Sequence, residues 1–204
     1  MLERFRDVWS AMVGPLARAL VRRGVSPDVI SLVGTLGVMA GALVCFPQGW
    51  LWQGVLVILV FIFSDLLDGQ VAKLSGTASS WGAFLDSSLD RLGDAAVFGG
   101  ILLFFVNQRS PFWASIALAA LVFGQVTSYV KARAEGLGFT VTGGLAARAD
   151  RLVVILLGAL LAGLGVPYVL EGATALLALG SLITVGQRIA QVRRQSAVAD
   201  AGPA

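Results

Sequence analysis

Long apolar runs separated by short polar segments dominate the chain. No charged residue occurs between Val29 and Ser64, and this run is too long for one membrane crossing of about 20 residues but suits two. Pro47, Gln48 and Gly49 supply a turn signal inside it. Four further apolar runs follow. We therefore predict an all-α polytopic membrane protein with six transmembrane helices, over residues 28–46, 51–73, 82–106, 112–130, 152–165 and 172–188.

The first 24 residues have a different pattern. Apolar residues recur there at helical spacing, and five arginines occupy other positions. This pattern is typical of an interfacial helix with its basic residues toward anionic lipid, although an ordinary amphipathic helix packed on protein has it too. Pro27 then begins a new helix. We expect an interfacial amphipathic helix over 1–24, a six-helix membrane domain over 25–194 and a disordered tail over 195–204.

Composition and charge agree with a membrane protein and indicate its orientation. The chain is 57% hydrophobic and only 13% charged, values outside the range of soluble domains. If successive helices cross the membrane in opposite directions, 14 of the 15 Lys and Arg residues lie on one side of the membrane. Only Arg109 then lies on the other side. The positive-inside rule then predicts a cell-membrane protein with both termini in the cytoplasm. We expect the bilayer, and no nucleic acid, as a partner.

Four aspartates occur where two predicted membrane helices meet across a short polar loop. Asp65 and Asp68 are three residues apart, and Asp86 and Asp90 are four apart, so each pair shares one helix face. An antiparallel hairpin brings these faces together, and carboxylates at a membrane need a cation, a cavity or a partner. The chain has no histidine, and all-oxygen donors favour Mg²⁺ or Mn²⁺ over zinc. We therefore predict a metal site at the four aspartates.

The spacing around these aspartates resembles a family signature. The pattern D-x-x-D-G-x-x-A, a basic residue, eight residues and then G-x-x-x-D-x-x-x-D is similar to the motif of the CDP-alcohol phosphotransferases, membrane enzymes of phospholipid synthesis. The matching positions are Asp65, Asp68, Gly69, Ala72, Lys73, Gly82, Asp86 and Asp90. Lys73 departs from the arginine usual in that family. The resemblance implies transfer of a phosphatidyl group from CDP-diacylglycerol to an alcohol with release of CMP, and it implies a homodimer.

The aspartates would have two roles in that reaction. Two divalent ions held by Asp65, Asp68 and Asp86 would neutralise a pyrophosphate and stabilise departing CMP. Asp90 is the candidate general base for the acceptor hydroxyl. The family resemblance implies the same division of roles. Whether Asp90 also ligates a metal stays open.

Small residues in the motif predict a nucleotide pocket. Glycine lacks Cβ, so Gly69 and Gly82 let a flat pyrimidine or a sugar approach the helix backbone. The family resemblance assigns these positions to cytidine and extends to residues 27–31, which it also assigns to the nucleotide. The predicted CDP-lipid-binding residues are Pro27, Asp28, Val29, Ile30, Ser31, Gly69, Ala72, Lys73, Ser79 and Gly82.

Basic residues on the cytoplasmic side suggest an anionic acceptor. A phosphorylated alcohol needs counter-charges that a neutral alcohol does not, although membrane topology alone also explains basic loops. The predicted acceptor-phosphate residues are Lys131, Arg133, Arg148, Arg151 and Arg188. Segments 128–135 and 148–151 resemble the actinobacterial phosphatidylinositol phosphate synthases. That resemblance implies inositol 1-phosphate as acceptor and phosphatidylinositol phosphate as product.

Two alternative functions stay open. A phosphatidylglycerophosphate synthase shares the aspartate motif and uses glycerol 3-phosphate, which is also anionic. A cation transporter also holds carboxylates in the membrane, but it is expected to place them near the bilayer midplane, often with repeat symmetry.

One turn beyond Asp90, Asp94 either assists the site or forms an ion pair with Arg91, Arg133 or Arg151, and we favour the ion pair.

Overall fold

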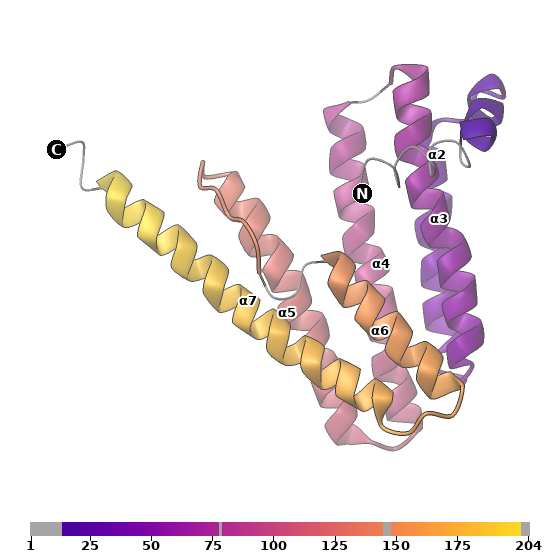
Figure 1. Ribbon diagram of the computed structural model, residues 1–204, viewed down its shortest axis with the longest axis vertical. Helices are drawn as coiled ribbons and strands as arrows, with labels where there is room; N and C mark the ends of the chain where they lie inside the picture. Colours follow the sequence, from indigo (N-terminus) through magenta and orange to yellow (C-terminus); the bar gives the residue numbers. More distant parts are fainter. Residues whose placement is uncertain (1–13, 78, 145–147, 201–204) are drawn as a thin grey trace, which may run out of the picture. The chain divides into compact units, whose positions relative to one another are not determined.

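The computed structural model describes residues 14–77, 79–144 and 148–200, without the side chains of 64–66 and 198–200. Within these residues the chain is helical and contains no strand (Figure 1), which confirms the all-α prediction. After a helix over 14–22, the helices are α2 (Pro27–Ala40), the π-helical turn η1 (Gly41–Cys45), α3 (Leu51–Ser75), α4 (Ser80–Asn107), α5 (Pro111–Glu135), α6 (Arg148–Gly163) and α7 (Val169–Asp200).

The chain divides into two compact units. The first comprises Met1–Val44 and Gln53–Val97, and the second comprises Cys45–Trp52 and Phe98–Ala204. Helices α3 and α4 contribute residues to both units. The aspartate motif belongs to the first unit, and the predicted acceptor-phosphate residues belong to the second.

Glycines allow close packing of α2 on α3 in the first unit. A Cβ at Gly37 would lie 2.2 Å from the ring of Phe61, and one at Gly41 would lie 3.0 Å from Cγ1 of Val57. Membrane helices often associate through such small residues, because burial of apolar side chains gives little advantage over contact with lipid. The approach of α2 to α3 positions the beginning of α2 near the aspartate motif.

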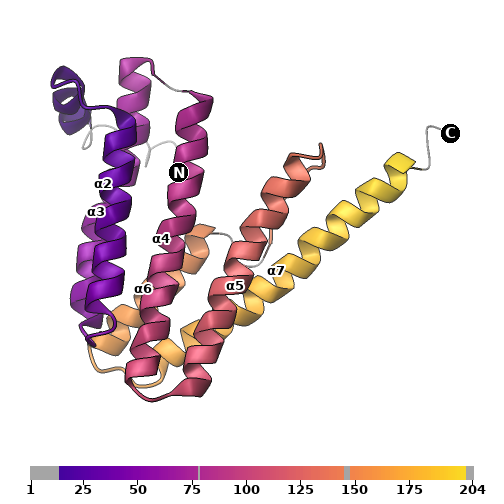
Figure 2. The ribbon, with the colours of Figure 1, turned by 180° about the vertical axis from the view of Figure 1, so that it is seen from behind.

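Helix α7 packs along α5 and against α6 in the second unit (Figures 1 and 2). The α7 residues Thr174, Ser181 and Thr184 are fully buried. The hydroxyls of Thr174 and Thr184 donate to carbonyl oxygens one turn back in the same helix, each at 2.7 Å. Thr174 and Thr184 therefore satisfy their hydroxyl groups within the helix, whereas the buried Oγ of Ser181 has no hydrogen-bond partner among the described residues.

The helices fit a multi-pass membrane protein. Four stretches are long and apolar enough to cross a membrane: Pro27–Cys45, Leu51–Ser75, Pro111–Glu135 and Val169–Ala197. Helix α4 carries several charged residues and α6 has only 16 residues, so the prediction of six spans stays a prediction for these two. Large apolar side chains such as Val60, Val153 and Leu176 are more than 60% exposed. Such a surface suits lipid and not water.

Helix α7 is longer than the sequence indicated. It extends to Asp200, into the segment 195–204 that we expected to be disordered, so the expectation is wrong for residues 195–200. The reason is a set of long-range contacts, because the side chains of Gln191 and Gln195 bond to the backbone of the loop after α5. Residues 201–204 lie outside the described residues, as do residues 1–13 of the predicted interfacial helix.

The close contact at the end of α6 generates a prediction about stability. A Cβ at Gly163 would lie 2.6 Å from the backbone nitrogen of Trp52, an atom that cannot rotate away as a flexible side chain can. We expect Gly163→Ala to lower the free energy of unfolding by about 1–3 kcal/mol, the usual cost of overpacking. The measurement is Tm in detergent micelles. Gly172→Ala in α7 is the control, because nothing lies within 4 Å of that Cβ. Equal Tm values for the two variants would contradict the close approach.

Candidate active site

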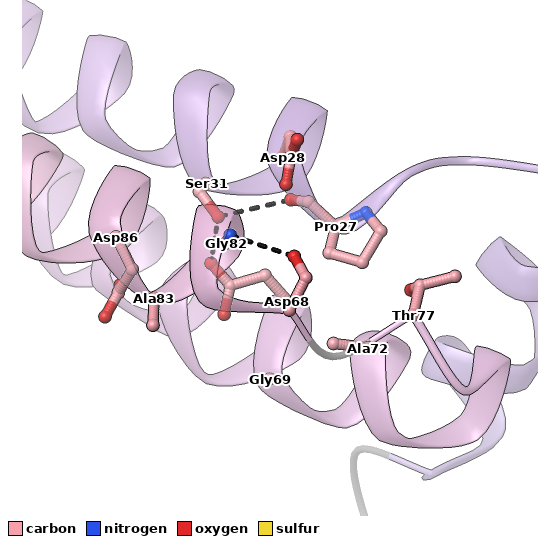
Figure 3. Close-up of a pocket in the computed structure, with 11 residues that line it drawn as sticks. Pro27, Asp28, Ser31, Asp68, Gly69, Ala72, Thr77, Gly82, Ala83 and Asp86 are labelled. Atoms are coloured by element: carbon pink, nitrogen blue, oxygen red, sulfur yellow. Dashed lines mark hydrogen bonds between the residues drawn. The ribbon is translucent and has the colours of Figure 1, made fainter.

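A pocket of about 330 Å³ lies in the first unit beside the aspartate motif (Figure 3). The beginning of α2, the C-terminal part of α3, the loop after it and the first turns of α4 form its walls. The lining residues are Pro27, Asp28, Ser31, Asp68, Gly69, Ala72, Thr77, Ser79, Gly82, Ala83 and Asp86. The pocket therefore contains seven of the ten predicted CDP-lipid residues together with two of the predicted metal ligands.

Helix caps position two of the walls. Ser26 caps α2, with its hydroxyl oxygen accepting from the backbone N–H of Val29 at 3.4 Å. Ser79 accepts from the backbone N–H of Gly82 at 3.1 Å at the start of α4. Such caps satisfy N–H groups that have no partner inside the helix. They hold the first turns of α2 and α4 at the rim of the pocket.

Trp81 connects these two helix beginnings. Its indole Nε1 donates a hydrogen bond of 3.1 Å to Oδ2 of Asp28, and its ring lies 5.9 Å from that of Phe84 between ring centres. The bond fixes a carboxylate at the pocket rim. Sequence analysis did not include Trp81, and only its place next to Gly82 in the motif could have drawn attention to it.

The glycine positions leave room for a ligand. A Cβ at Gly69 would meet nothing within 4 Å, and one at Gly82 would meet only Oγ of Ser79, at 3.5 Å. Both residues line the pocket. Packing between helices does not require glycine here, as it does at Gly37, so the open space supports the interpretation that a ligand approaches the backbone at these points.

Two carboxylates from different helices line the same pocket. Asp68 of α3 is only 7% exposed and accepts a hydrogen bond from the hydroxyl of Ser31, whose oxygen also lies 3.2 Å from the carbonyl oxygen of Pro27. Asp86 of α4 is exposed to the pocket. Carboxylate oxygens are the donors that Mg²⁺ and Mn²⁺ prefer. Asp68 and Asp86 therefore fit a divalent cation.

The structure gives less support for the other two predicted metal ligands, Asp65 and Asp90. The side chain of Asp65 lies outside the described residues. Asp90 does not line the pocket, and its Oδ2 lies 3.9 Å from Nη2 of Arg91. Among the side chains that the structure describes, no three potential metal ligands come together. The four-aspartate site stays a prediction.

Asp94 forms the ion pair that the sequence suggested. Its Oδ2 lies 3.6 Å from Nη2 of Arg91, one turn earlier in α4, and its side chain is 5% exposed. Of the three possible partners, Arg91 is on the same helix as Asp94. Residues three apart in a helix share a face, which allows this ion pair.

Three predicted CDP-lipid residues lie outside the pocket. Ile30 is buried in a cluster with Ala17 and Val71, Val29 is half exposed, and Lys73 is exposed on α3. The reason is helical geometry, because successive residues differ in direction by about 100°. Sequence analysis took 27–31 as one unit and missed two lining residues, Thr77 in the loop and Ala83 next to Gly82.

Two predicted acceptor residues converge on one face of α5 in the second unit. Arg151 of α6 is 2% exposed, with Nε 3.4 Å from the position of a Cβ on Gly124. Arg188 of α7 is 8% exposed, and its Nη1 donates to the carbonyl oxygen of Thr127 at 2.7 Å. Gly124 and Thr127 are three residues apart in α5, which places both guanidinium groups along the same face. Lys131, one turn on, pairs with Glu135 at 3.8 Å.

The loop after α5 is held against α7 by three side chains on one face of that helix. Gln195 bonds to the backbone N–H and carbonyl of Thr140, at 3.0 and 2.7 Å. Gln191 bonds to the same two groups of Thr142, at 3.3 and 3.1 Å. Nη2 of Arg188 donates to the carbonyl oxygen of Gly143 at 3.2 Å. The two glutamines, which sequence analysis missed, therefore hold the loop that helps to fix Arg188.

The remaining two predicted acceptor residues are placed differently. Arg133 lies on another side of α5, where it lines a groove with Tyr129 and Leu137, away from the face of Gly124 and Thr127. Arg148 is the first residue of α6. The structure therefore brings Arg151 and Arg188 together along α5 but does not bring Arg133 to them.

Comparisons with known proteins agree with the motif. Residues 24–186 match the family model for CDP-alcohol phosphatidyltransferase. The chain is 49% identical to a phosphatidylinositol phosphate synthase of Cutibacterium acnes, over 95% of this chain and 98% of the relative. It is 46% identical to one of Streptomyces avermitilis, over 100% of this chain and 87% of the relative.

Solved structures of the phosphatidylinositol phosphate synthase of Mycobacterium tuberculosis are also similar. One, with CDP-DAG bound, has a TM-score of 0.85 and 39% identity, covering 89% of this chain and 94% of that chain. Another, in complex with manganese and citrate, has a TM-score of 0.85 and 40% identity, covering 88% of each chain. The family model spans most of the chain and includes the whole aspartate motif, and the chain therefore belongs to the CDP-alcohol phosphatidyltransferase family.

Proposed function

We propose that the protein transfers the phosphatidyl group of CDP-diacylglycerol to the hydroxyl of inositol 1-phosphate, giving phosphatidylinositol phosphate and CMP. The observation that carries this proposal is the pocket in which Asp68 and Asp86 lie beside Gly69 and Gly82. It combines carboxylates for a cation with open backbone for a nucleotide. Relatives at 46–49% identity that are phosphatidylinositol phosphate synthases support the reaction, and family membership favours an enzyme over a transporter.

The reaction needs one bond to form and one to break. The acceptor hydroxyl oxygen attacks the phosphorus that carries diacylglycerol, and the phosphoanhydride bond to CMP breaks. In our proposal Asp90 accepts the proton of the acceptor hydroxyl. This role suits a carboxylate on the same helix face as Asp86. Two Mg²⁺ or Mn²⁺ ions bound by Asp65, Asp68 and Asp86 would supply charge neutralisation for the pyrophosphate. The manganese complex of the M. tuberculosis relative supports such a divalent ion.

Residues of the first unit would bind and orient the CDP-lipid. The hydroxyl of Ser31 donates to Oδ2 of Asp68 and so orients this carboxylate at the pocket. Trp81 holds Asp28 at the rim. The M. tuberculosis relative with CDP-DAG bound supports this lipid as the donor. We retain Lys73 as a phosphate contact, since it lies one residue beyond Ala72, which lines the pocket.

Residues of the second unit would bind the acceptor phosphate. Arg188 donates to two backbone carbonyls, which are neutral and do not cancel its charge. A buried guanidinium group is costly unless an anion compensates it. Arg151 is also buried along the same face of α5, and planar guanidinium groups bind phosphate in a bidentate manner. We therefore assign the acceptor phosphate to Arg151 and Arg188, with Lys131 and Arg148 as secondary candidates.

The membrane arrangement remains part of the proposal. We propose six membrane spans with both termini and the pocket on the cytoplasmic side of the cell membrane, because 14 of the 15 basic residues then lie inside. Soluble inositol 1-phosphate would enter and soluble CMP would leave on that side. A homodimer is proposed from the family resemblance.

The cation site generates a prediction at Asp68. We expect Asp68→Asn to lower kcat about 100-fold or more, because a bound cation contributes several kcal/mol to stabilisation of developing charge. Excess EDTA should abolish CMP release by the unmutated protein. Titration of Mn²⁺ followed by electron paramagnetic resonance should show weaker binding by the variant. Asp150→Asn is the matched control, because Asp150 is exposed at the start of α6 and does not line the pocket. Undiminished turnover after chelation would remove the metal from the proposal.

The acceptor site generates a prediction at Arg151. We expect Arg151→Gln to raise KM for inositol 1-phosphate about 10- to 200-fold, the equivalent of roughly 1.5–3 kcal/mol for a hydrogen bond to a charged group. KM for CDP-diacylglycerol should stay near that of the unmutated protein. Lys131→Gln, at an exposed position, gives a second test if the buried change prevents folding, and Arg194→Gln is the control for loss of charge. Equal use of free inositol and inositol 1-phosphate by the unmutated protein would contradict a phosphate site.

A further inference from the structure

A second cavity, of about 360 Å³, lies between α5 and α7 in the second unit. We call it the α5–α7 groove. Its walls include Tyr129 and Arg133 from α5, Leu137 from the turn after α5, and Ile189, Val192 and Arg193 from α7. No step of the proposed reaction uses this groove, and neither of the two buried arginines of the acceptor site lines it.

The groove lies where apolar helices become charged. In α5 the apolar run ends at Val130 and the first cation is Lys131, and in α7 the first cation is Arg188. Large side chains at the groove are exposed, with Tyr129 at 66%, Leu137 at 54% and Ile189 at 53%. Helix ends with this composition lie at the level of lipid headgroups, where aromatic and basic residues gather.

The groove also carries two cations that lack a counter-charge. Arg133 and Arg193 are exposed on the groove, and within the described part of the chain neither takes part in an ion pair. The nearest acidic residue along α5, Glu135, pairs with Lys131 at 3.8 Å. A mostly apolar groove whose lining also includes two guanidinium groups is complementary to a molecule with an acyl chain and a phosphate.

We propose that the α5–α7 groove binds an anionic phospholipid of the surrounding bilayer. One acyl chain lies along the apolar wall that includes Tyr129 and Ile189, and the phosphate lies between Arg133 and Arg193. The occupant is a bilayer lipid and not a soluble phosphate, because most lining residues are apolar and the groove lies where two candidate membrane spans become charged. This site is separate from the proposed CDP-lipid pocket, whose lining residues all belong to the first unit.

The test is lipid retention by the full-length protein. The protein is reconstituted in nanodiscs of phosphatidylcholine and phosphatidylglycerol at a ratio of 4:1, released into detergent, and analysed by native mass spectrometry. The unmutated protein should retain phosphatidylglycerol in preference to phosphatidylcholine. Arg133→Gln combined with Arg193→Gln should lower that retention about tenfold, since two charge-assisted hydrogen-bonding groups are lost. Arg193→Gln alone should lower it by a smaller factor.

Arg194→Gln is the matched control. It removes the same charge from the neighbouring exposed position of α7 but does not line the groove, so it should retain phosphatidylglycerol as the unmutated protein does. Equal retention by the double variant and the unmutated protein would overturn the proposal, as would an equal loss in Arg194→Gln. A changed ratio of dimer to monomer with an unchanged lipid count would also overturn it, because the groove would then be an interface between two copies of the chain.

Discussion

Charged side chains buried in an otherwise apolar chain are the constraint on which the rest of the structure depends. Asp68, Asp94 and Arg188 are each less than 10% exposed, and a charge removed from water must be compensated. Asp94 has Arg91, and Arg188 has two backbone carbonyls. Asp68 accepts a hydrogen bond from the hydroxyl of Ser31, and its position at a pocket suits a cation. Two of these buried charges, Asp68 and Arg188, lie at the proposed donor and acceptor sites.

Glycine has two distinct uses in this protein. At Gly37 and Gly163 a Cβ would collide with another helix or with a neighbouring backbone, so these glycines serve packing. At Gly69 the Cβ position is open, yet the residue lines the pocket. Membrane helices use small residues for association, and an unfilled position beside carboxylates is better explained by a ligand. The distinction requires the positions of neighbouring atoms, which no sequence pattern supplies.

Sequence reasoning predicted most of the fold and the centre of the pocket. Apolar runs located the long helices because they depend on local composition. The predicted antiparallel hairpin placed Asp68 of α3 and Asp86 of α4 at one pocket. Errors arose where orientation or long-range contacts decide. Ile30 was grouped with Ser31 although it faces a core cluster. Arg133 was grouped with Arg151 because both are basic and cytoplasmic, but α5 presents Arg133 on a different side.

The end of the chain illustrates a second limit. Small and polar residues after Arg194 indicated a tail, but α7 continues to Asp200. The glutamines at 191 and 195 bond to a loop about 50 residues earlier in the chain, and such contacts are not visible in local composition. These bonds also join the helix to the loop that contacts Arg188. Gln195, in the segment expected to be disordered, thus helps to hold the loop beside the proposed acceptor site.

In the proposed reaction inositol 1-phosphate, an anionic polyol, accepts the phosphatidyl group from CDP-diacylglycerol. The most direct measurement is release of CMP by the purified full-length protein, with CDP-diacylglycerol and Mg²⁺ present and inositol 1-phosphate, glycerol 3-phosphate or free inositol added in turn. We expect rapid CMP release with inositol 1-phosphate and far slower release with the other two acceptors. Preference for glycerol 3-phosphate would contradict the assigned acceptor, and no CMP release with any of the three would contradict the proposed reaction itself.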